Sequence, residues 1–352
     1  MAISNLLEPT DLGLYCPAGD FYVDPWRPVD RAVVTHAHGD HTCRGCVRYL
    51  TSRDGENVLR ARIGDEAVIE SAGYGATVHV NGVTVSLHPA GHILGSAQVR
   101  IEHGGAVAVV SGDYKVEPDA TCAPFDPVRC HVFVSESTFG LPIYRWPSQA
   151  DVFETIRAWW VSNQDAGRAS LLFAYSLGKA QRLIFGLGTG PGPIYTHGAV
   201  ETMNRAYRAS GVPLPETTYA ASKSDAVWSR SLIVAPPSAQ GSPWLRRFGA
   251  ASTGFASGWM SIRGARRRRS VDRGFVLSDH ADWPGLLSAI DATGAEQVWL
   301  THGYTSVVAR WLRDQGRDTR TISTRYEGER DDSPGEANAD EPAGTNFDGT
   351  GA

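Results

Sequence analysis

Three of the eleven histidines fall within six residues, in the segment THAHGDH at positions 35–41. An apolar run typical of a buried strand precedes the segment, so its side chains would gather in one small volume where that strand ends. Imidazole and carboxylate groups are ligands for zinc, manganese and iron. His36, His38, Asp40 and His41 therefore form a candidate metal site, and the glycine between them permits a tight turn.

Further polar clusters stand where other predicted strands begin or end. They are Gly91-His92, Gly112-Asp113, Ser278-Asp279-His280 and Thr301-His302-Gly303. A lone histidine after a strand is more often a surface or capping residue. The set as a whole, however, supplies enough donors for two metal ions, and Asp113 is the natural candidate for a bridging carboxylate.

Short apolar runs predict the strands that must position these clusters. In the first part of the chain the runs lie at 31–35, 84–88, 97–101, 106–110 and 131–134. Near residue 147 the pattern changes, because apolar residues between 152 and 160 share one helical face. Strands at 170–174, 194–195 and 232–235 and a helix beginning at Lys179 follow. Runs at 274–277 and 297–300 then resume the first pattern, so the middle block is interpreted as an insertion into an α/β domain.

The motif His-x-His-x-Asp-His at 36–41, followed by His92, Asp113 and a late His302, resembles the metallo-β-lactamase superfamily. Four further segments are similar to the motifs of its β-CASP nucleases: SEST at 135–138 (motif A), FAYSLGKAQ at 173–181 (a helix-start signature), SDHAD at 278–282 (motif B) and THG at 301–303 (motif C). Within that group the chain most closely resembles the bacterial DNA-ligase-associated exonuclease family, also called mRNA 3'-end processing factor-like. The short length, the compact insertion, DPWR at 24–27 and STFGLP at 137–142 carry this resemblance.

The resemblance covers about residues 11–323 and implies the fold and its divisions. We expect an αββα metallo-β-lactamase sandwich, with the metals at strand ends along one edge, and an inserted β-CASP-like α/β domain. Residues 1–145 would form the first part of the sandwich, 146–272 the insertion and 273–324 the returning segment. Residues 325–352 would form a disordered acidic tail, because they are rich in Gly, Asp, Glu and Pro.

The same resemblance implies the role of each site residue. One metal would be held by His36, His38 and His92, the other by Asp40, His41 and His302, and Asp113 would bridge the two. The cofactors would be two divalent ions, manganese or zinc, which activate a hydroxide for attack on phosphorus. Asp40 and Asp113 thus belong to the catalytic set, and two further residues complete it. His280 would protonate the leaving oxygen, and Glu136 would accept its other N–H.

A basic run precedes motif B and is a candidate for contact with a nucleic-acid backbone. It contains Arg266, Arg267, Arg268 and Arg269, and such a run is equally typical of a solvated loop. Lys179, at a predicted helix N-terminus, could likewise receive a phosphate.

The composition is that of a globular protein, with 42% hydrophobic and 20% charged residues. No apolar run approaches the roughly 18 residues of a membrane helix, so no membrane partner is expected. The first residues contain Glu8 and Asp11 and lack a basic start, and the five cysteines suggest no disulfide framework. These features predict a cytoplasmic location. The net charge of −5 hides a tail of −7 from Glu327 onward, made of eight acids and one arginine, which leaves +2 for the rest.

Three functions compete. The leading hypothesis is a DNA nuclease acting on single strands in repair, alongside an ATP-dependent DNA ligase and a helicase, as the resemblance implies. An RNA 3'-end processing or RNA-degrading nuclease is the first alternative, because motif C carries His302 where well-known eukaryotic DNA-repair members carry valine. A small-molecule metallo-hydrolase is the second alternative, and the inserted block argues against it. Endonucleolytic and exonucleolytic cleavage are both compatible with these residues.

Overall fold

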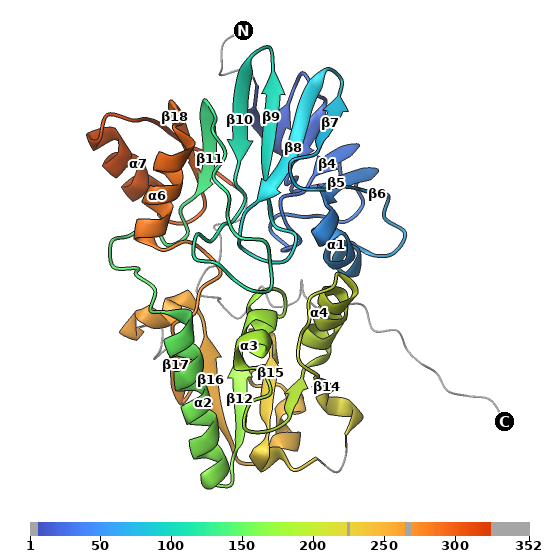
Figure 1. Cartoon of the computed structure of the whole chain (residues 1–352), viewed down its shortest axis with the longest axis vertical. Helices are drawn as coiled ribbons and strands as arrows, with labels where there is room; N and C mark the ends of the chain where they lie inside the picture. Colours follow the sequence, from blue (N-terminus) through green and yellow to red (C-terminus); the bar gives the residue numbers. More distant parts are fainter. Residues whose placement is uncertain (1–5, 224–225, 265–268, 325–352) are drawn as a thin grey trace, which may run out of the picture.

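The computed structural model describes residues 6–223, 226–264 and 269–324, whose strands form three sheets (Figure 1). The first sheet has the order β1-β2-β3-β4-β5-β6. Its strands are β1 Glu8–Thr10, β2 Gly13–Cys16, β3 Phe21–Val23, β4 Arg31–Val33, β5 Arg48–Ser52 and β6 Ile69–Ala72. The second sheet has the order β19-β18-β11-β10-β9-β8-β7. Its strands are β7 Thr77–Val80, β8 Val83–Pro89, β9 Ala97–His103, β10 Ala106–Val110, β11 Val132–Glu136, β18 Gln297–Thr301 and β19 Asp318–Thr321.

The first two sheets face each other across one apolar core. Phe21 and Leu50 from the first sheet pack with Val85, Val99 and Val134 from the second. The strand β10 is buried along its whole length, as its continuous apolar run AVAVV predicts for a strand covered on both faces.

Helices cover the outer faces of these two sheets. They are α1 Glu56–Ile63 on the first sheet and α6 Trp283–Thr293 and α7 Thr305–Asp314 on the second (Figure 1). Helix α6 begins where Asp282 accepts a hydrogen bond from the Gly285 amide at 2.9 Å, and it ends at Gly294, whose φ of 63° suits a glycine. This part of the chain is therefore layered as helix, sheet, sheet, helix.

The third sheet is parallel throughout and has the order β14-β13-β15-β12-β16-β17. Its strands are β12 Ala169–Phe173, β13 Ile194–Thr196, β14 Thr218–Tyr219, β15 Leu232–Ala235, β16 Ala251–Ala256 and β17 Arg273–Phe275. It occupies the lower half of Figure 1 with the helices α2 Gln149–Asp165, α3 Lys179–Leu187 and α4 Gly198–Ala209. Its other face carries short 3-10 turns, among them Trp228–Arg230, Pro243–Phe248 and Gly258–Ser261. Three more 3-10 turns span Arg53–Gly55, Ala220–Ser222 and Pro237–Ala239.

The strands predicted from apolar runs are confirmed, with one difference in placement. The run at 274–277 was expected to return to the first domain at residue 273. Instead β17 pairs in parallel with β16 and closes the third sheet, so the chain returns only after Phe275. β17 has only three residues, RGF, and Phe275 is the buried one, so its pairing partner is decided by packing rather than by its own sequence.

Two predicted segments lie outside the described residues. These are the acidic tail at 325–352 and Arg266 to Arg268 of the basic run. Within the described ranges, no helix combines the length and the apolar character needed to cross a membrane.

Candidate metal centre

The candidate site lies along one edge of the first two sheets, where strands of both sheets end. The segment 35–41 follows β4, Asp113 follows β10, and Glu136 ends β11. His302 follows β18, which pairs in parallel with β11, as β11 does with β10. Because the carboxyl ends of parallel strands meet at one edge, residues far apart in sequence converge there.

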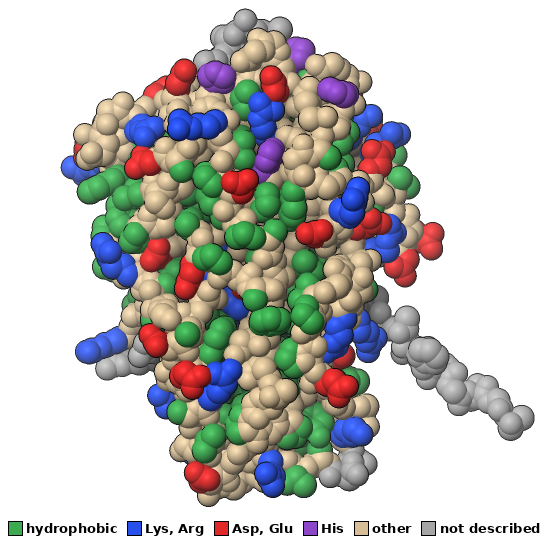
Figure 2. Space-filling view, in the orientation of Figure 1, with side chains coloured by type: hydrophobic (Ala, Val, Ile, Leu, Met, Phe, Trp, Pro, Cys, Tyr) green, Lys and Arg blue, Asp and Glu red, His purple; other side chains and the backbone are tan. Residues whose placement is uncertain are grey.

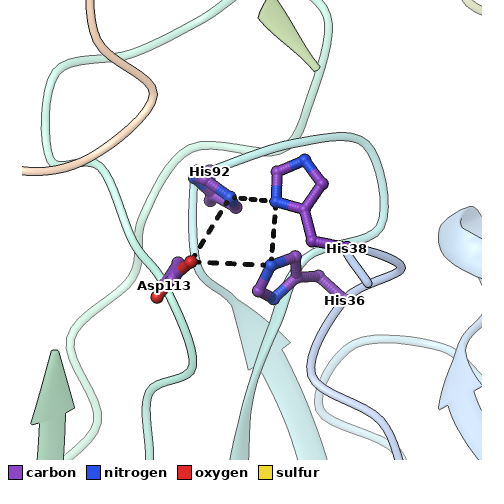
Figure 3. Close-up of side chains that lie close together, drawn as sticks. All are labelled: His36, His38, His92 and Asp113. Carbon is purple, nitrogen blue, oxygen red and sulfur yellow. Dashed lines mark hydrogen bonds and ion pairs between the residues drawn. The ribbon is translucent and has the colours of Figure 1, made fainter. Parts of the chain in front are cut away.

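The first group of donors is His36, His38, His92 and Asp113, which point toward one another in Figure 3. His38 Nδ1 lies 3.1 Å from His36 Nε2 and 3.0 Å from His92 Nε2. Asp113 Oδ2 lies 3.7 Å from His36 Nε2 and 3.9 Å from His92 Nε2. One donor atom from each residue therefore surrounds a single small volume, as expected for a metal site.

A second group shares the same carboxylate. His41 Nε2 lies 3.4 Å from Asp113 Oδ2, and His302 Nδ1 lies 3.9 Å from Asp113 Oδ1. Asp40, predicted to complete this group, stands further out, with its carboxylate 3.8 Å from His41 Nε2 and 26% of its side chain exposed. Asp113 is thus common to both groups, which is the position a bridging ligand requires.

His302 is held in a strained backbone conformation. Its φ is 53°, in the left-handed region that costs a non-glycine residue about 1 kcal/mol or more. The Ser137 hydroxyl donates to the carbonyls of Thr301 at 3.1 Å and His302 at 2.5 Å. A Cβ on Gly303 would lie 2.4 Å from the Ser137 carbonyl oxygen, so only glycine fits beside it. Ser137 of motif A therefore fixes the loop of motif C, which carries His302.

The ionisation of His36, His92 and Asp113 suits a bound cation. Burial, followed by the neighbouring imidazoles, holds the pKa of His36 and His92 well below the usual value, so both rings are neutral with free lone pairs. Burial alone would raise the pKa of Asp113, but the charge of His41 and then that of His280 hold it well below its usual range. Two buried atoms, His41 Nε2 and Asp113 Oδ1, have no hydrogen-bond partner among the described residues. Neutral imidazoles, a carboxylate and unpaired buried donor atoms together fit divalent metal ions.

The outer nitrogens of the three candidate ligand histidines of the first group face acceptors. His36 Nδ1 lies 3.1 Å from the Thr35 hydroxyl, and His38 Nε2 lies 3.2 Å from the Leu177 carbonyl. His92 Nδ1 donates to the Asp279 carbonyl at 2.8 Å. Such outer partners fix the tautomer that points the free nitrogen at a metal.

Asp24 is a site residue that the sequence analysis used only as part of a family signature. Its Oδ2 accepts from His41 Nδ1 at 2.7 Å and from the Thr35 hydroxyl at 2.6 Å, and its Oδ1 accepts from the Thr35 amide at 2.8 Å. Burial lowers the pKa of His41, but the carboxylates of Asp113 and Asp40, aided by Asp24, raise it well above the usual value. An aspartate before a proline is a common turn feature, so its type and position alone gave no signal of this role.

We expect Asp24→Asn to weaken metal binding by about 10–100-fold, the usual cost of losing an outer partner of a ligand histidine. The measurement is a competition titration of zinc against a chromophoric chelator. Asp20→Asn is the matched control. Asp20 and Asp24 both have a positive φ, but Asp20 accepts from the Tyr15 hydroxyl in an exposed hydrogen bond. Equal zinc affinity in the two variants would show that Asp24 does not support His41.

His280 and Glu136 form a pair beside the donors. His280 Nδ1 lies 2.9 Å from Glu136 Oε2 and 3.1 Å from Oε1, which also accepts from the Tyr114 amide at 2.8 Å. Asp113 Oδ2 is 4.0 Å from the same His280 nitrogen. The histidine is therefore oriented by a buried carboxylate and stands next to the shared aspartate. Trp146 Nε1 donates to the His280 carbonyl at 2.9 Å and helps to hold the loop.

A small cavity of about 40 Å³ opens beside the second donor group. Asp40, His41 and His302 line its polar end, and Leu14, Trp26 and Val110 contribute to its apolar wall. A water molecule needs roughly 10–15 Å³ of such space. Water therefore has room next to the second group of donors.

The candidate nucleic-acid contacts are placed differently from expectation. Lys179, proposed to receive a phosphate at the helix N-terminus, is 0% exposed, and its ammonium lies 3.4 Å from Asp279 Oδ2. Arg269 lies partly buried, with its guanidinium 4.6 Å from the centre of the Phe255 ring. Figure 2 shows basic and acidic side chains mixed over the displayed face of the molecule.

The chain is similar in sequence to two kinds of known protein, one named as a DNA ligase and the other as an endoribonuclease. The chain is 31% identical over 313 residues, 88% of its length, to a protein named "Probable DNA ligase" from Opitutus terrae, and the match covers 30% of that protein. It is 33% identical over 120 residues to "Endoribonuclease YSH1" from Yarrowia lipolytica and from Saccharomyces cerevisiae, which is 33% of this chain and 14% and 15% of those proteins. The chain thus spans less than a third of these curated relatives. No family model matches.

Solved structures share the fold, and one of them shows the extent of the likeness. "Crystal Structure of a Protein of Unknown Function from Enterococcus faecalis V583" superposes with a TM-score of 0.57 at 12% identity, covering 84% of this chain and 80% of that one. At this identity the likeness concerns the arrangement of the chain alone.

Proposed function

We propose that this protein is a metal-dependent nuclease of the β-CASP group in the metallo-β-lactamase superfamily. It hydrolyses phosphodiester bonds in DNA, preferring single strands, in a repair setting. The observation that carries the proposal is the position of Asp113, shared by two groups of metal donors and 4.0 Å from the histidine of the His280–Glu136 pair. Metal donors beside a proton-transfer pair suit phosphoryl transfer to water.

The layering of the chain supports the family assignment. Two sheets around one core with helices outside correspond to the αββα sandwich, and the parallel sheet with α2, α3 and α4 corresponds to the inserted β-CASP-like domain. We assign residues 1–145 and the segment up to 324 to the sandwich and 146–272, extended by β17, to the insertion.

The residues present fit two divalent ions, manganese or zinc. His36, His38 and His92 would hold one, Asp40, His41 and His302 the other, and Asp113 both. Bound there, the ions would lower the pKa of a water molecule and neutralise charge on the phosphate.

The protein's own groups supply the remaining steps. Asp24 and the Asp279 carbonyl keep His41 and His92 oriented, so the donors are in place before substrate arrives. His280 donates a proton to the leaving oxygen, since Glu136 holds its Nδ1 and orients the ring beside Asp113. The cavity beside His41 and His302 has room for water next to the second group of donors.

DNA is the substrate favoured by the longer match, which is to a protein named as a DNA ligase. The same match supports action alongside an ATP-dependent DNA ligase, and a helicase partner is proposed from the family resemblance alone. RNA is the second candidate, and the matches to proteins named as endoribonucleases favour it.

A single assay tests these alternatives. Purified protein is incubated with end-labelled single-stranded DNA, double-stranded DNA and RNA of one sequence, and with the lactam nitrocefin, under manganese, zinc or chelator. We expect metal-dependent cleavage of single-stranded DNA at the highest rate. The Asp113→Ala protein, purified in parallel, controls for a contaminating nuclease.

Other outcomes would replace the proposal. Faster cleavage of RNA than of DNA would favour the RNA-processing function, and mapped product ends would distinguish exonucleolytic from endonucleolytic cleavage. Hydrolysis of nitrocefin without cleavage of any nucleic acid would indicate a small-molecule hydrolase.

A further inference from the structure

A cluster of buried charges lies between the third sheet and the candidate site. Arg182 and Lys179 on α3 are 3% and 0% exposed, and they meet Asp279 and Asp119, whose side chains are each 3% exposed. Burying charges costs several kcal/mol per ion unless each is paired. We therefore expect these paired charges to hold the segments that carry them in a defined arrangement.

Arg182 contacts three separate segments around the site. Its Nη1 donates to the Ser278 carbonyl at 2.6 Å and lies 3.0 Å from Asp279 Oδ1. Its Nη2 donates to the His92 carbonyl at 3.3 Å, and its Nε pairs with Asp119. One guanidinium thus bridges the loop of a metal donor, the loop of the proposed acid and the segment after Asp113.

These contacts reach the functional side chains through short paths. The Asp279 carbonyl accepts from His92 Nδ1 at 2.8 Å, and Asp279 directly precedes His280 in the chain. Lys179 Nζ lies 3.4 Å from the other oxygen of the Asp279 carboxylate. A shift of Asp279 would therefore move both the His92 ring and the backbone that carries His280.

The start of α3 is pressed against the His92 loop as well. Gly178 has a φ of 87°, and a Cβ there would lie 2.2 Å from Ile93 Cγ2. The Gln181 side chain accepts from the Gly178 amide at 2.8 Å and closes this turn. Helix α3 is therefore fixed against the residue next to a metal donor by packing as well as by charge.

Arg182 and Asp279 favour their charged forms. Burial lowers the pKa of Arg182, but Asp119 and Asp279 raise it above its usual value. Burial would raise the pKa of Asp279, but Lys179 and Arg182 hold it below its usual range. The contacts are hence charged ones, about twice as strong as neutral hydrogen bonds.

We propose that Arg182 is a positioning residue of the nuclease site. From the inserted domain, it holds the His92 loop and the Ser278–His280 loop in a fixed position relative to each other. The inference rests on the proposed function and names how the third sheet serves it. The guanidinium fork of Arg182 is required, because a lysine presents its donors from a single point and cannot reach the carbonyls of both loops and Asp119 together.

The test compares Arg182→Lys with Arg208→Lys. Arg208 is the matched control, since it pairs with Glu201 at 3.4 Å and donates to the Pro215 carbonyl within the same domain, away from the site. We expect Arg182→Lys to bind zinc about 10–100-fold more weakly in chelator competition. We also expect kcat on single-stranded DNA to fall at least about tenfold while KM stays within about twofold. Arg208→Lys should change neither quantity.

The readouts separate this inference from the proposed function. Zinc affinity is measured without substrate, so a loss in Arg182→Lys would support the positioning role even if the natural protein cut no nucleic acid. Unchanged zinc affinity and kcat in a folded Arg182→Lys protein would overturn the inference, as would an equal loss in Arg208→Lys. Should Arg182→Lys not fold, Asp119→Asn is measured instead, because it removes the carboxylate that Nε contacts. The same loss of zinc affinity is expected there, and wild-type affinity would overturn the inference.

Discussion

Asp113→Ala is expected to abolish cleavage and to remove at least one of two bound metal ions. Its Oδ2 lies between 3.4 and 3.9 Å from nitrogens of His36, His41 and His92, so its loss leaves Asp40 as the one carboxylate among the proposed ligands to offset two dications. Loss of an outer partner costs about 10–100-fold, so loss of a shared ligand should lower kcat by more than about 10³-fold. The measurements are metal content after dialysis against zinc or manganese and the cleavage rate in excess metal.

Two further variants sharpen this experiment. Asp113→Asn keeps the shape but not the charge, and it should retain more metal than the alanine variant while cutting slowly. Asp291→Ala is the control, because Asp291 is 69% exposed and pairs with Arg317 on the outer surface. Full activity of a metal-loaded Asp113→Ala protein would contradict a site built on a shared carboxylate.

The position of the candidate site was predictable because strand ends are readable from sequence. The apolar runs of β10, β11 and β18 each stop at a polar residue, and parallel pairing brings Asp113, Glu136 and His302 to one edge. Adjacent polar residues such as those at 36–41 need only one strand end to be brought together. Local pattern therefore predicted that Asp113 and His302 lie near the cluster at 36–41, whereas Glu136 was expected from the family resemblance.

The supporting residues were not predictable, because prediction from strand ends finds only residues that belong to a local pattern. Arg182 and Asp119 are 63 positions apart, and neither belongs to a pattern at a strand end. Lys179 was expected at an open helix N-terminus, but helical periodicity does not say that α3 presses that end against the His92 loop. Contacts between domains depend on how two finished surfaces fit, and single-sequence patterns contain no signal of that fit.

His280→Ala is expected to separate proton transfer from metal binding. His280 Nδ1 faces Glu136 rather than the centre of either main donor group, so removing the ring should leave metal content and substrate affinity unchanged. Turnover of DNA should fall by about 10²–10⁴-fold, the range typical of one general acid. Metal content, KM and kcat measured on one preparation would distinguish this pattern from that of Asp113→Ala.

The leaving group gives the decisive comparison for His280. Bis-p-nitrophenyl phosphate releases an oxygen that departs without a proton, so His280→Ala should lose much less activity on it than on DNA. Glu136→Gln should show a milder form of the same difference, because glutamine still accepts from the Tyr114 amide but no longer offers a negative charge to the His280 ring. Loss of metal from His280→Ala, or an equal loss of rate on both substrates, would instead make His280 a ligand. That outcome would agree with its place in a third possible donor group with Asp113 and Glu136, and the proton would then have to come from elsewhere.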